Sequence, residues 1–393
     1  QFGNLLKLVY EICKPQQNEG AGGSWGLGKT VYFRMGVGLV IYYSRIFQDN
    51  KYIERMAACM VEDETKKDAI IPPNGKLKRG IAWWGKSIDK NHTIPLENDP
   101  EIEEILNIFG IKKYCGDETG TSIIIPYINA DRLLSDVYAK NEEDFDRPYW
   151  TRQIGEYINV AVQRWYAPRI RNSKYSFGPY LAPSVNGDGI TPDNMLPLFQ
   201  VIRAMYNITE ENKNSNCFTE EGCSVLLESI NLRNVFSDKT TAGRLIAVKL
   251  NKNYLRMLPP DNCKSPYQQV SNTVATMDSG NSPLIMYTRR PGMIVGYDYN
   301  GIWTHSMIKC SPDEFIIGLF VLNSTNHLKN DADQKKISLE EYIRQGEKAD
   351  HAAWTDHNVK GNNPRIVHNI QRNVIKRINQ NYKERIVDTS ERK

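Results

Sequence analysis

The spacing of hydrophobic residues predicts that helices and strands are mixed along this chain. Apolar residues recur at helical spacing in four separate stretches, 4–12, 149–165, 195–205 and 364–385. Short runs rich in β-branched and aromatic residues predict strands at 39–45, 119–128, 244–250, 284–288, 293–297 and 315–322. Two more helices are expected, at 30–38 and at 100–109, where acidic residues occupy the first turn. Together these elements predict an α+β fold.

Charge and turn residues divide this pattern into three regions. The acidic stretch 141–146, which Pro148 follows, predicts a boundary. We therefore expect a first α/β domain at 1–132 and a second, α+β domain at 146–328. Residues 329–393 are expected to form a charged linker and an amphipathic helix. This end of the chain is basic, because residues 360–393 carry nine Lys or Arg against three Asp or Glu, a local net charge of +6.

Composition narrows the class of protein. The chain has 393 residues, 40% of them hydrophobic and 10% aromatic, which excludes disorder over the whole length. Its 50 basic and 46 acidic residues nearly cancel, so net charge alone does not indicate nucleic acid binding. No uninterrupted apolar run approaches the roughly 18 residues of a membrane-spanning helix, which argues against an integral membrane protein. The seven cysteines form no Cys-x-x-Cys pair, which predicts a reduced, cytoplasmic protein without a zinc ribbon.

The segment most informative about chemistry is GGSWGLGKT, at 22–30. Its glycines, Gly22, Gly23, Gly26 and Gly28, let backbone N–H groups approach an anion. The helix expected to follow offers its positive N-terminus, and Lys29 supplies a point charge. A glycine-rich loop that merely turns the chain is the plainer alternative, but the residue types favour a phosphate-binding loop.

Two nucleotide-binding interpretations compete for this loop. Residues 23–30 satisfy G-x-x-x-x-G-K-[ST], the P-loop signature. A P-loop, however, leaves directly from a buried apolar strand, whereas the preceding residues 13–22 are polar and contain a proline. No apolar run ending in Asp-Glu follows to hold magnesium. The P-loop remains an alternative.

The same segment resembles the ATP lid of the GHKL superfamily, which includes gyrase-type topoisomerases, heat-shock chaperones, histidine kinases and mismatch-repair ATPases. The lid, helix and strand of that family occur in the same order here: GSWGLGK is followed by a helix with GVG and then by LVIYYSR at 39–45. About 90 residues after the lid, TGTSIII is similar to the family's Gly-Thr strand. The resemblance covers about the first 130 residues and implies a Bergerat-type α/β sandwich that binds ATP and Mg²⁺. The implied binding residues in this part of the chain are Gly22, Gly23, Ser24, Gly26, Leu27, Gly28, Lys29, Thr30, Gly120 and Thr121.

The chain departs from this family in one respect that concerns catalysis. Two motifs of the family cannot be found in this sequence. One is a helix with a Glu base and a magnesium-binding Asn, and the other is a strand that turns through Asp-x-Gly-x-Gly. Both would lie upstream of Gln1, so we expect the sequence to be part of a longer protein, and the catalytic residue is unknown. Glu156 and Asn159 have the wrong spacing and order, and we interpret them as ordinary helix residues.

The second half resembles bacterial proteins that pair a GHKL ATPase domain with a transducer-like domain, often near anti-phage genes. The segments that carry this resemblance are RPGMIVGYD at 290–298, IIGLFVL at 316–322 and DHAAW at 350–354. In related ATPases the second domain lends a basic residue to the γ-phosphate. Lys249, Arg289 and Arg290 are the candidates here, with solvated strand-end residues as the plainer interpretation.

Two hypotheses of different class follow. The first is an ATP-driven conformational switch with ATPase activity, which works as a homodimer or with a protein partner in a defence complex. The second is a non-hydrolysing scaffold or nucleic-acid-binding module with a degenerate nucleotide site. The basic terminal helix could contact nucleic acid phosphates, although a packed helix with a solvated basic face is the plainer expectation. The six histidines match no known zinc spacing, so no metal site is predicted from them.

Overall fold

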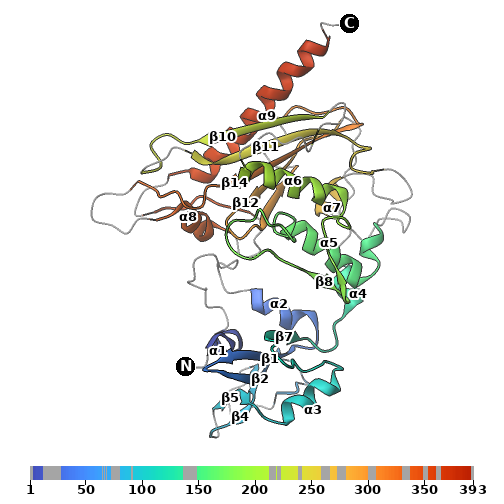
Figure 1. Ribbon diagram of the computed structural model, residues 1–393, viewed down its shortest axis with the longest axis vertical. Helices are drawn as coiled ribbons and strands as arrows, with labels where there is room; N and C mark the ends of the chain where they lie inside the picture. The colour runs from blue at the N-terminus through green and yellow to red at the C-terminus, as the bar shows by residue number, and fades with distance from the viewer. Residues whose placement is uncertain are drawn as a thin grey trace. The chain divides into compact units, whose positions relative to one another are not determined.

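The computed structural model of the chain divides into two compact units. The described residues up to 133 form the first unit and those from 134 onward form the second. Both units are drawn in Figure 1. The structure describes residues 3–11, 28–63, 65, 67, 69–71, 80–89, 92–135, 148–211, 218, 223–237, 241–257, 266–271, 280–299, 307–329, 337–347, 353–359 and 364–390.

The first unit is built on an antiparallel sheet of five strands in the order β3-β2-β1-β7, with β6 also paired to β2. The central hairpin runs from Leu39 opposite Met60 to Gln48 opposite Lys51, where Asp49 and Asn50 adopt positive φ in the turn. The strands are β1 (Leu39–Gln48), β2 (Lys51–Val61), β3 (Ile81–Trp84), β6 (Leu96–Glu97) and β7 (Gly120–Ile124).

Helices cover both faces of this sheet. The even-numbered residues of β1, such as Val40 and Tyr42, pack with Leu5 and Val9 of α1 (Gly3–Tyr10) and Phe33 of α2 (Gly28–Met35). The odd-numbered residues of β1 pack with Ile102 and Leu106 of α3 (Glu101–Ile108) on the opposite face. The alternation of side chains along a strand produces this division. The remaining short elements are β4 (Lys86–Ser87), β5 (Thr93–Ile94) and α4 (Ala130–Ser135).

The second unit contains a mixed sheet of five strands in the order β10-β11-β14-β12-β13. All neighbouring strands pair antiparallel except β12 and β14, which are parallel. The strands are β10 (Ser224–Asn231), β11 (Thr241–Asn251), β12 (Leu284–Thr288), β13 (Ile294–Asp298) and β14 (Glu314–Leu322). A separate two-stranded ribbon joins β8 (Ser184–Val185) to β9 (Asp188–Gly189).

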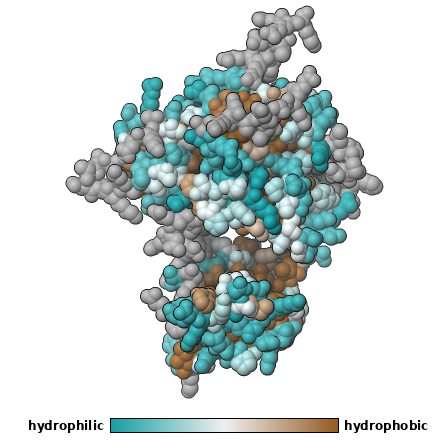
Figure 2. Space-filling model, in the orientation of Figure 1, coloured by the Kyte–Doolittle hydropathy of each residue, from teal (hydrophilic) through white to brown (hydrophobic). Residues whose placement is uncertain are grey.

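This sheet is the middle layer of three (Figure 1). On one face, Ile246, Val248 and Ile317 pack with α5 (Ile154–Tyr166) and α6 (Pro197–Glu211), together with residues of α7 (Pro266–Ser271). On the other face, the neighbouring strand residues, among them Ile316 and Phe320, pack with α8 (Leu339–Gly346) and α9 (Ile366–Ser390). A 3-10 turn, η2 (Tyr149–Thr151), precedes α5. The surface of this unit that faces the viewer in Figure 2 is largely hydrophilic, in keeping with cores that lie between the layers.

The structure confirms the predicted α+β class and most predicted elements, but it revises the third region. Residues 329–393 do not form a separate unit: α8 lies within the stretch expected to be a charged linker, and both α8 and α9 belong to the second unit. The local sequence conceals α8 because it is short and half of its non-glycine side chains or more are polar, although Leu339, Tyr342 and Ile343 share a buried face. The strands β2 and β10 were also not predicted.

A buried charge cluster links β12 to α8. The Arg289 guanidinium donates hydrogen bonds to Glu347 (2.7 Å) and to Glu340 (2.8 Å), and its side chain is fully buried. Glu340 also accepts hydrogen bonds from the Ser324 hydroxyl (2.8 Å) and the Arg290 backbone N–H (3.2 Å). Burial alone would lower the pKa of Arg289, but the contacts with Glu347 and Glu340 outweigh it and raise the pKa. The cluster thus holds one cation against two carboxylates.

Replacing Arg289 with methionine should strongly destabilise the second unit, because two buried carboxylates would lose the guanidinium that they share. The expected loss is about 3–5 kcal/mol in the free energy of unfolding, measured by urea denaturation. Arg233, which is exposed, provides the matched control, since Arg233→Met should cost less than about 0.5 kcal/mol. A loss below about 1 kcal/mol for Arg289→Met would contradict this account of the cluster.

Candidate functional site

The predicted phosphate-binding loop lies largely outside the described residues. This applies to Gly22, Gly23, Ser24, Gly26 and Leu27. The structure does place the last three residues of the motif: Gly28 is the first residue of α2, and Lys29 and Thr30 belong to its first turn. The motif therefore runs into a helix N-terminus, as the sequence predicted. Nothing within 4 Å would meet a Cβ at Gly28, so open space adjoins its Cα.

Lys29 lies against the end of α1. Its ammonium donates hydrogen bonds to the carbonyl oxygens of Lys7 (2.8 Å) and Glu11 (2.9 Å). These carbonyls belong to the last turn of α1 and the residue just beyond it, where a helix lacks internal donors and carries partial negative charge. In this conformation the Lys29 charge therefore caps α1, a role that the sequence did not indicate.

Gly120 and Thr121 open β7, which lies beside β1. Thr121 pairs with Ser44, and Ser44 lies two residues from Tyr42, which packs under α1 and α2. Directly paired residues share a face of the sheet. Thr121 therefore lies on the face that α2 covers, and it is exposed. At Gly120 a Cβ would come within 2.8 Å of the Tyr114 ring, so the close approach of that ring requires glycine.

A row of polar side chains crosses four strands at the level of Thr121. Arg55 of β2 pairs with Ser44 on one side and with Glu97 of β6 on the other, so the row reads Glu97, Arg55, Ser44, Thr121. Arg55 Nε donates to Glu97 Oε2 at 2.9 Å. Sequence reasoning missed Arg55 and Glu97 because β2 was not predicted, and the row depends on the register of the β1–β2 hairpin.

The basic residues proposed for the γ-phosphate already have partners in the second unit. Lys249 forms an ion pair with Glu314 at 2.8 Å, and Arg289 belongs to the buried cluster. The Arg290 guanidinium lies 5.5 Å from the centroid of the Phe177 ring. The fully buried position of Arg289 removes it as a phosphate ligand in this conformation.

Lys249 and Arg290 also lie at opposite ends of the sheet. Lys249 is level with Ile316 of β14, whereas Thr288, two residues before Arg290, is level with Val321. The five positions between Ile316 and Val321 correspond to about 16 Å at about 3.3 Å per residue. The two side chains therefore cannot contact one phosphate group together, so at most one of these two candidates can serve a given γ-phosphate.

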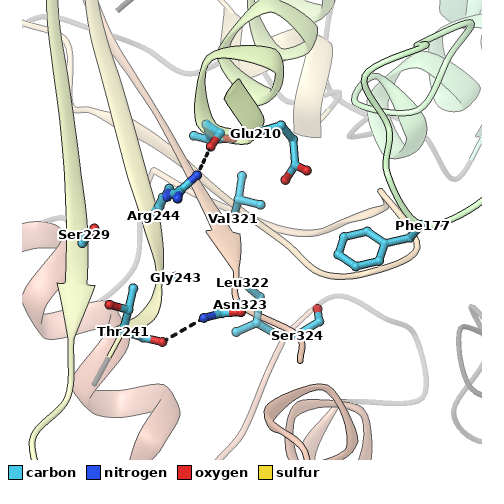
Figure 3. Close-up of a pocket in the computed structure, with 11 residues that line it drawn as sticks. Phe177, Glu210, Ser229, Thr241, Gly243, Arg244, Val321, Leu322, Asn323 and Ser324 are labelled. Carbon is cyan, nitrogen blue, oxygen red and sulfur yellow. Dashed lines mark hydrogen bonds between the residues drawn. The ribbon is translucent and has the colours of Figure 1, made fainter. Parts of the chain in front are cut away.

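A polar pocket in the second unit was not foreseen. It lies where β10, β11 and β14 meet the end of α6, and its volume is about 360 Å³ (Figure 3). Its charged lining residues are Glu210 of α6 and Arg244 of β11, whose guanidinium donates to the Thr209 carbonyl oxygen at 2.5 Å. Burial raises the pKa of nearby Tyr206, and the Glu210 charge adds to that rise. No sequence signal predicts this pocket, since its residues come from separate elements.

The basic terminal helix packs against the sheet, as the plainer of the two expectations predicted. Ile370, Val374 and Ile378 are buried against the sheet, and Tyr382 donates to the carbonyl oxygens of Ser224 and Ala247, each at 3.1 Å. The Asp356 carboxylate accepts backbone N–H groups at the start of the helix, which also favours it electrostatically. The exposed basic residues are Arg372, Lys376, Arg377 and Lys383. Nucleic acid binding by this face stays a prediction.

Within the described part of the chain, no group of three or more His, Cys, Asp or Glu side chains is arranged to hold a metal ion. None of the described helices has the length and apolar character needed to cross a lipid bilayer. Glu156 and Asn159 lie in α5, where Asn159 Oδ1 accepts a hydrogen bond from Gln163 at 2.6 Å.

Removal of the Lys29 ammonium should destabilise the first unit, because the two carbonyl groups at the end of α1 would lose their charged donor. We expect Lys29→Ala to cost about 1 kcal/mol of stability, seen as a lower Tm by circular dichroism. Arg34→Ala tests the same helix at an exposed position and should change stability by less than about 0.5 kcal/mol. Equal Tm values for the two variants would show that the cap contributes nothing measurable.

Two sets of changes in α9 separate packing from electrostatics. Ile378→Asn should lower stability by about 3 kcal/mol or more, because a buried apolar side chain is replaced by an amide. Replacing Arg372, Lys376, Arg377 and Lys383 together with glutamine should leave the Tm nearly unchanged and should not alter nucleic acid affinity. If that fourfold variant instead flattens the dependence of affinity on salt by about two to four units, the helix is a phosphate-tracking arm.

Comparison with known proteins returns no match of any kind, since no family model, no curated protein and no solved structure matches this chain. The resemblance to GHKL ATPases therefore stays a prediction that rests on the residues quoted for it.

Proposed function

We propose that this protein binds ATP with Mg²⁺ through a GHKL-type lid and acts as an ATP-driven conformational switch in a bacterial defence complex. One observation carries the proposal: the Gly-rich motif leads into α2, α2 leads into β1, and β1 pairs with β7, so that Thr121 lies on the face covered by α2. The two segments that resemble the family's lid and Gly-Thr strand are about 90 residues apart in sequence but belong to one layered unit.

The chemistry of these residues suits a nucleotide. Gly28 and Lys29 stand at a helix N-terminus, where backbone N–H groups and the helix dipole attract phosphate. Thr121 offers an exposed hydroxyl group on the sheet face, next to apolar Ile123, which is also exposed, whereas the neighbouring Ser44 is buried. A surface with hydrogen-bonding groups beside an apolar residue fits a base better than a bare phosphate.

The cap on α1 suggests how nucleotide would act as a switch. The Lys29 ammonium has three N–H donors, and two of them bind the carbonyl oxygens of Lys7 and Glu11, so a phosphate would compete with these carbonyl groups for the same positive charge. A phosphate would therefore draw Lys29 away and leave the end of α1 uncapped. Nucleotide would favour the conformation in which α1 is released, and its differential affinity would set the size of the change.

The fold weighs against the rival P-loop. The last described element before the motif is the helix α1 rather than a buried strand. The second hypothesis, a scaffold that binds nucleotide without hydrolysis, remains as the alternative, since no catalytic base is assigned. Binding without turnover would favour it.

Calorimetry with ATP and Mg²⁺ tests the proposed site. Lys29→Ala should weaken ATP binding at least severalfold, because a charge-assisted phosphate contact contributes about 1.5–3 kcal/mol. Arg34→Ala, in the same helix, should leave the dissociation constant unchanged. Phosphate release measured on the same samples distinguishes a switch that hydrolyses ATP from a scaffold that does not.

Two results would count against the proposal. The first is no ATP binding by the whole chain, and the second is equal binding by the Lys29→Ala and Arg34→Ala variants. Because the Lys29 variant is expected to lose stability, binding is measured well below its Tm, where both variants are folded.

A further inference from the structure

We propose that the pocket at the end of α6 binds a small zwitterion of the α-amino acid type, with Arg244 for its carboxylate and Glu210 for its ammonium group. The pocket belongs to the second unit and is independent of the proposed nucleotide site in the first. Its volume of about 360 Å³ falls within the usual size of small-molecule sites.

Two opposite charges line this pocket without neutralising each other. Among the described residues, neither Arg244 nor Glu210 takes part in an ion pair. Elsewhere in this unit comparable charges are paired, as Lys249 is with Glu314. A half-buried pair of opposite charges kept apart is an arrangement that a ligand with both charges would complete.

The hydrogen bonds of these two residues leave capacity for a ligand. Arg244 donates from Nη1 to the Thr209 carbonyl oxygen, and a guanidinium has five N–H donors. Glu210 accepts from the Ser176 hydroxyl at Oε2 (3.0 Å), which leaves Oε1 for another donor. Both anchoring contacts orient the charged groups before any ligand arrives.

The helix end strengthens the assignment of the ammonium group to Glu210. Glu210 lies in the last turn of α6, where carbonyl oxygens carry partial negative charge and favour a cation. Thr209, which accepts from Arg244, is the residue before Glu210. The Arg244 guanidinium is therefore held at the carbonyl group next to Glu210, so both charged groups lie at the same end of α6.

The remaining walls define the side chain that would fit. In the view of Figure 3, Val321 lies between Arg244 and Glu210, and the Phe177 ring stands across the space from them. Phe177 is held by Tyr175, whose ring centroid lies 6.2 Å away, and by the Arg290 guanidinium. Apolar walls at Phe177 and Val321 favour an apolar amino acid, such as leucine or phenylalanine. Hydroxyl and amide groups of Ser229, Thr241 and Asn323 complete the lining.

Calorimetry of the whole chain with L-leucine and L-phenylalanine tests this inference. Two analogues remove one charge each: N-acetyl-L-leucine lacks the ammonium group, and L-leucinamide lacks the carboxylate. We expect L-leucine to bind at least tenfold more tightly than either analogue, a difference of about 1.4 kcal/mol. Inorganic phosphate and AMP test whether the pocket is instead an anion site.

Variants assign each charge to its partner. Glu210→Gln keeps the Ser176 contact and should weaken L-leucine binding at least tenfold while leaving N-acetyl-L-leucine binding unchanged. Glu211→Gln is the matched control, since Glu211 is the next residue but does not line the pocket, and it should bind like the wild type. Arg244→Gln should weaken the binding of L-leucine but not that of L-leucinamide. Arg244→Lys keeps the positive charge but loses the planar fork of donors, so it should bind L-leucine more weakly than the wild type and more tightly than Arg244→Gln.

Several outcomes would overturn the inference. These are no binding of L-leucine or L-phenylalanine to the wild type at 10 mM, tighter binding of phosphate or AMP than of either amino acid, or equal L-leucine affinity in the Glu210→Gln and Glu211→Gln variants. None of these outcomes bears on ATP binding by the Lys29 loop, so the two proposals fail separately.

Discussion

Burial of a sheet on both faces is the constraint on which the second unit depends. The central strand β14 pairs with β11 along one edge and with β12 along the other, and its residues from Phe315 to Phe320 are all buried. A strand in this position needs a helical layer on each side. For this reason α8 and α9 return to the sheet, although their sequence is strongly charged. Polar chemistry is then confined to the ends of the strands.

Both ends of this sheet carry charged side chains, but the two ends differ in how these charges are paired. At one end Lys249 and Glu314 neutralise each other, and near the other end Arg289 is enclosed with Glu340 and Glu347. The pocket beside that second end keeps Arg244 and Glu210 unneutralised. Ser324 connects the two arrangements, since it lines the pocket and donates to Glu340. A ligand in the pocket would therefore adjoin a rigid, buried network rather than a loop.

The first unit places its candidate chemistry on a sheet face and at a helix end. The Lys29 ammonium donates a hydrogen bond to a carbonyl oxygen at the end of α1. The polar row that ends at Thr121 crosses the sheet on the face under α2. These features belong to one layered unit. In the proposed function, coupling between them needs an element with two arrangements, and an exchange of Lys29 between the carbonyl oxygens and a phosphate would supply one.

The amino-acid sequence by itself determined the types of most elements, because helical and strand periodicity is a local property. The strand at 284–288, the helix that begins after the Gly-rich loop and the packed seam of α9 were all predicted in this way. Only the tertiary structure decided which charges meet. Arg289 and Glu347 are 58 residues apart, and Arg244 and Thr209 are 35 apart. Their contacts depend on strand order and register, which a single sequence leaves open, since pairing free energies are summed over the whole sheet.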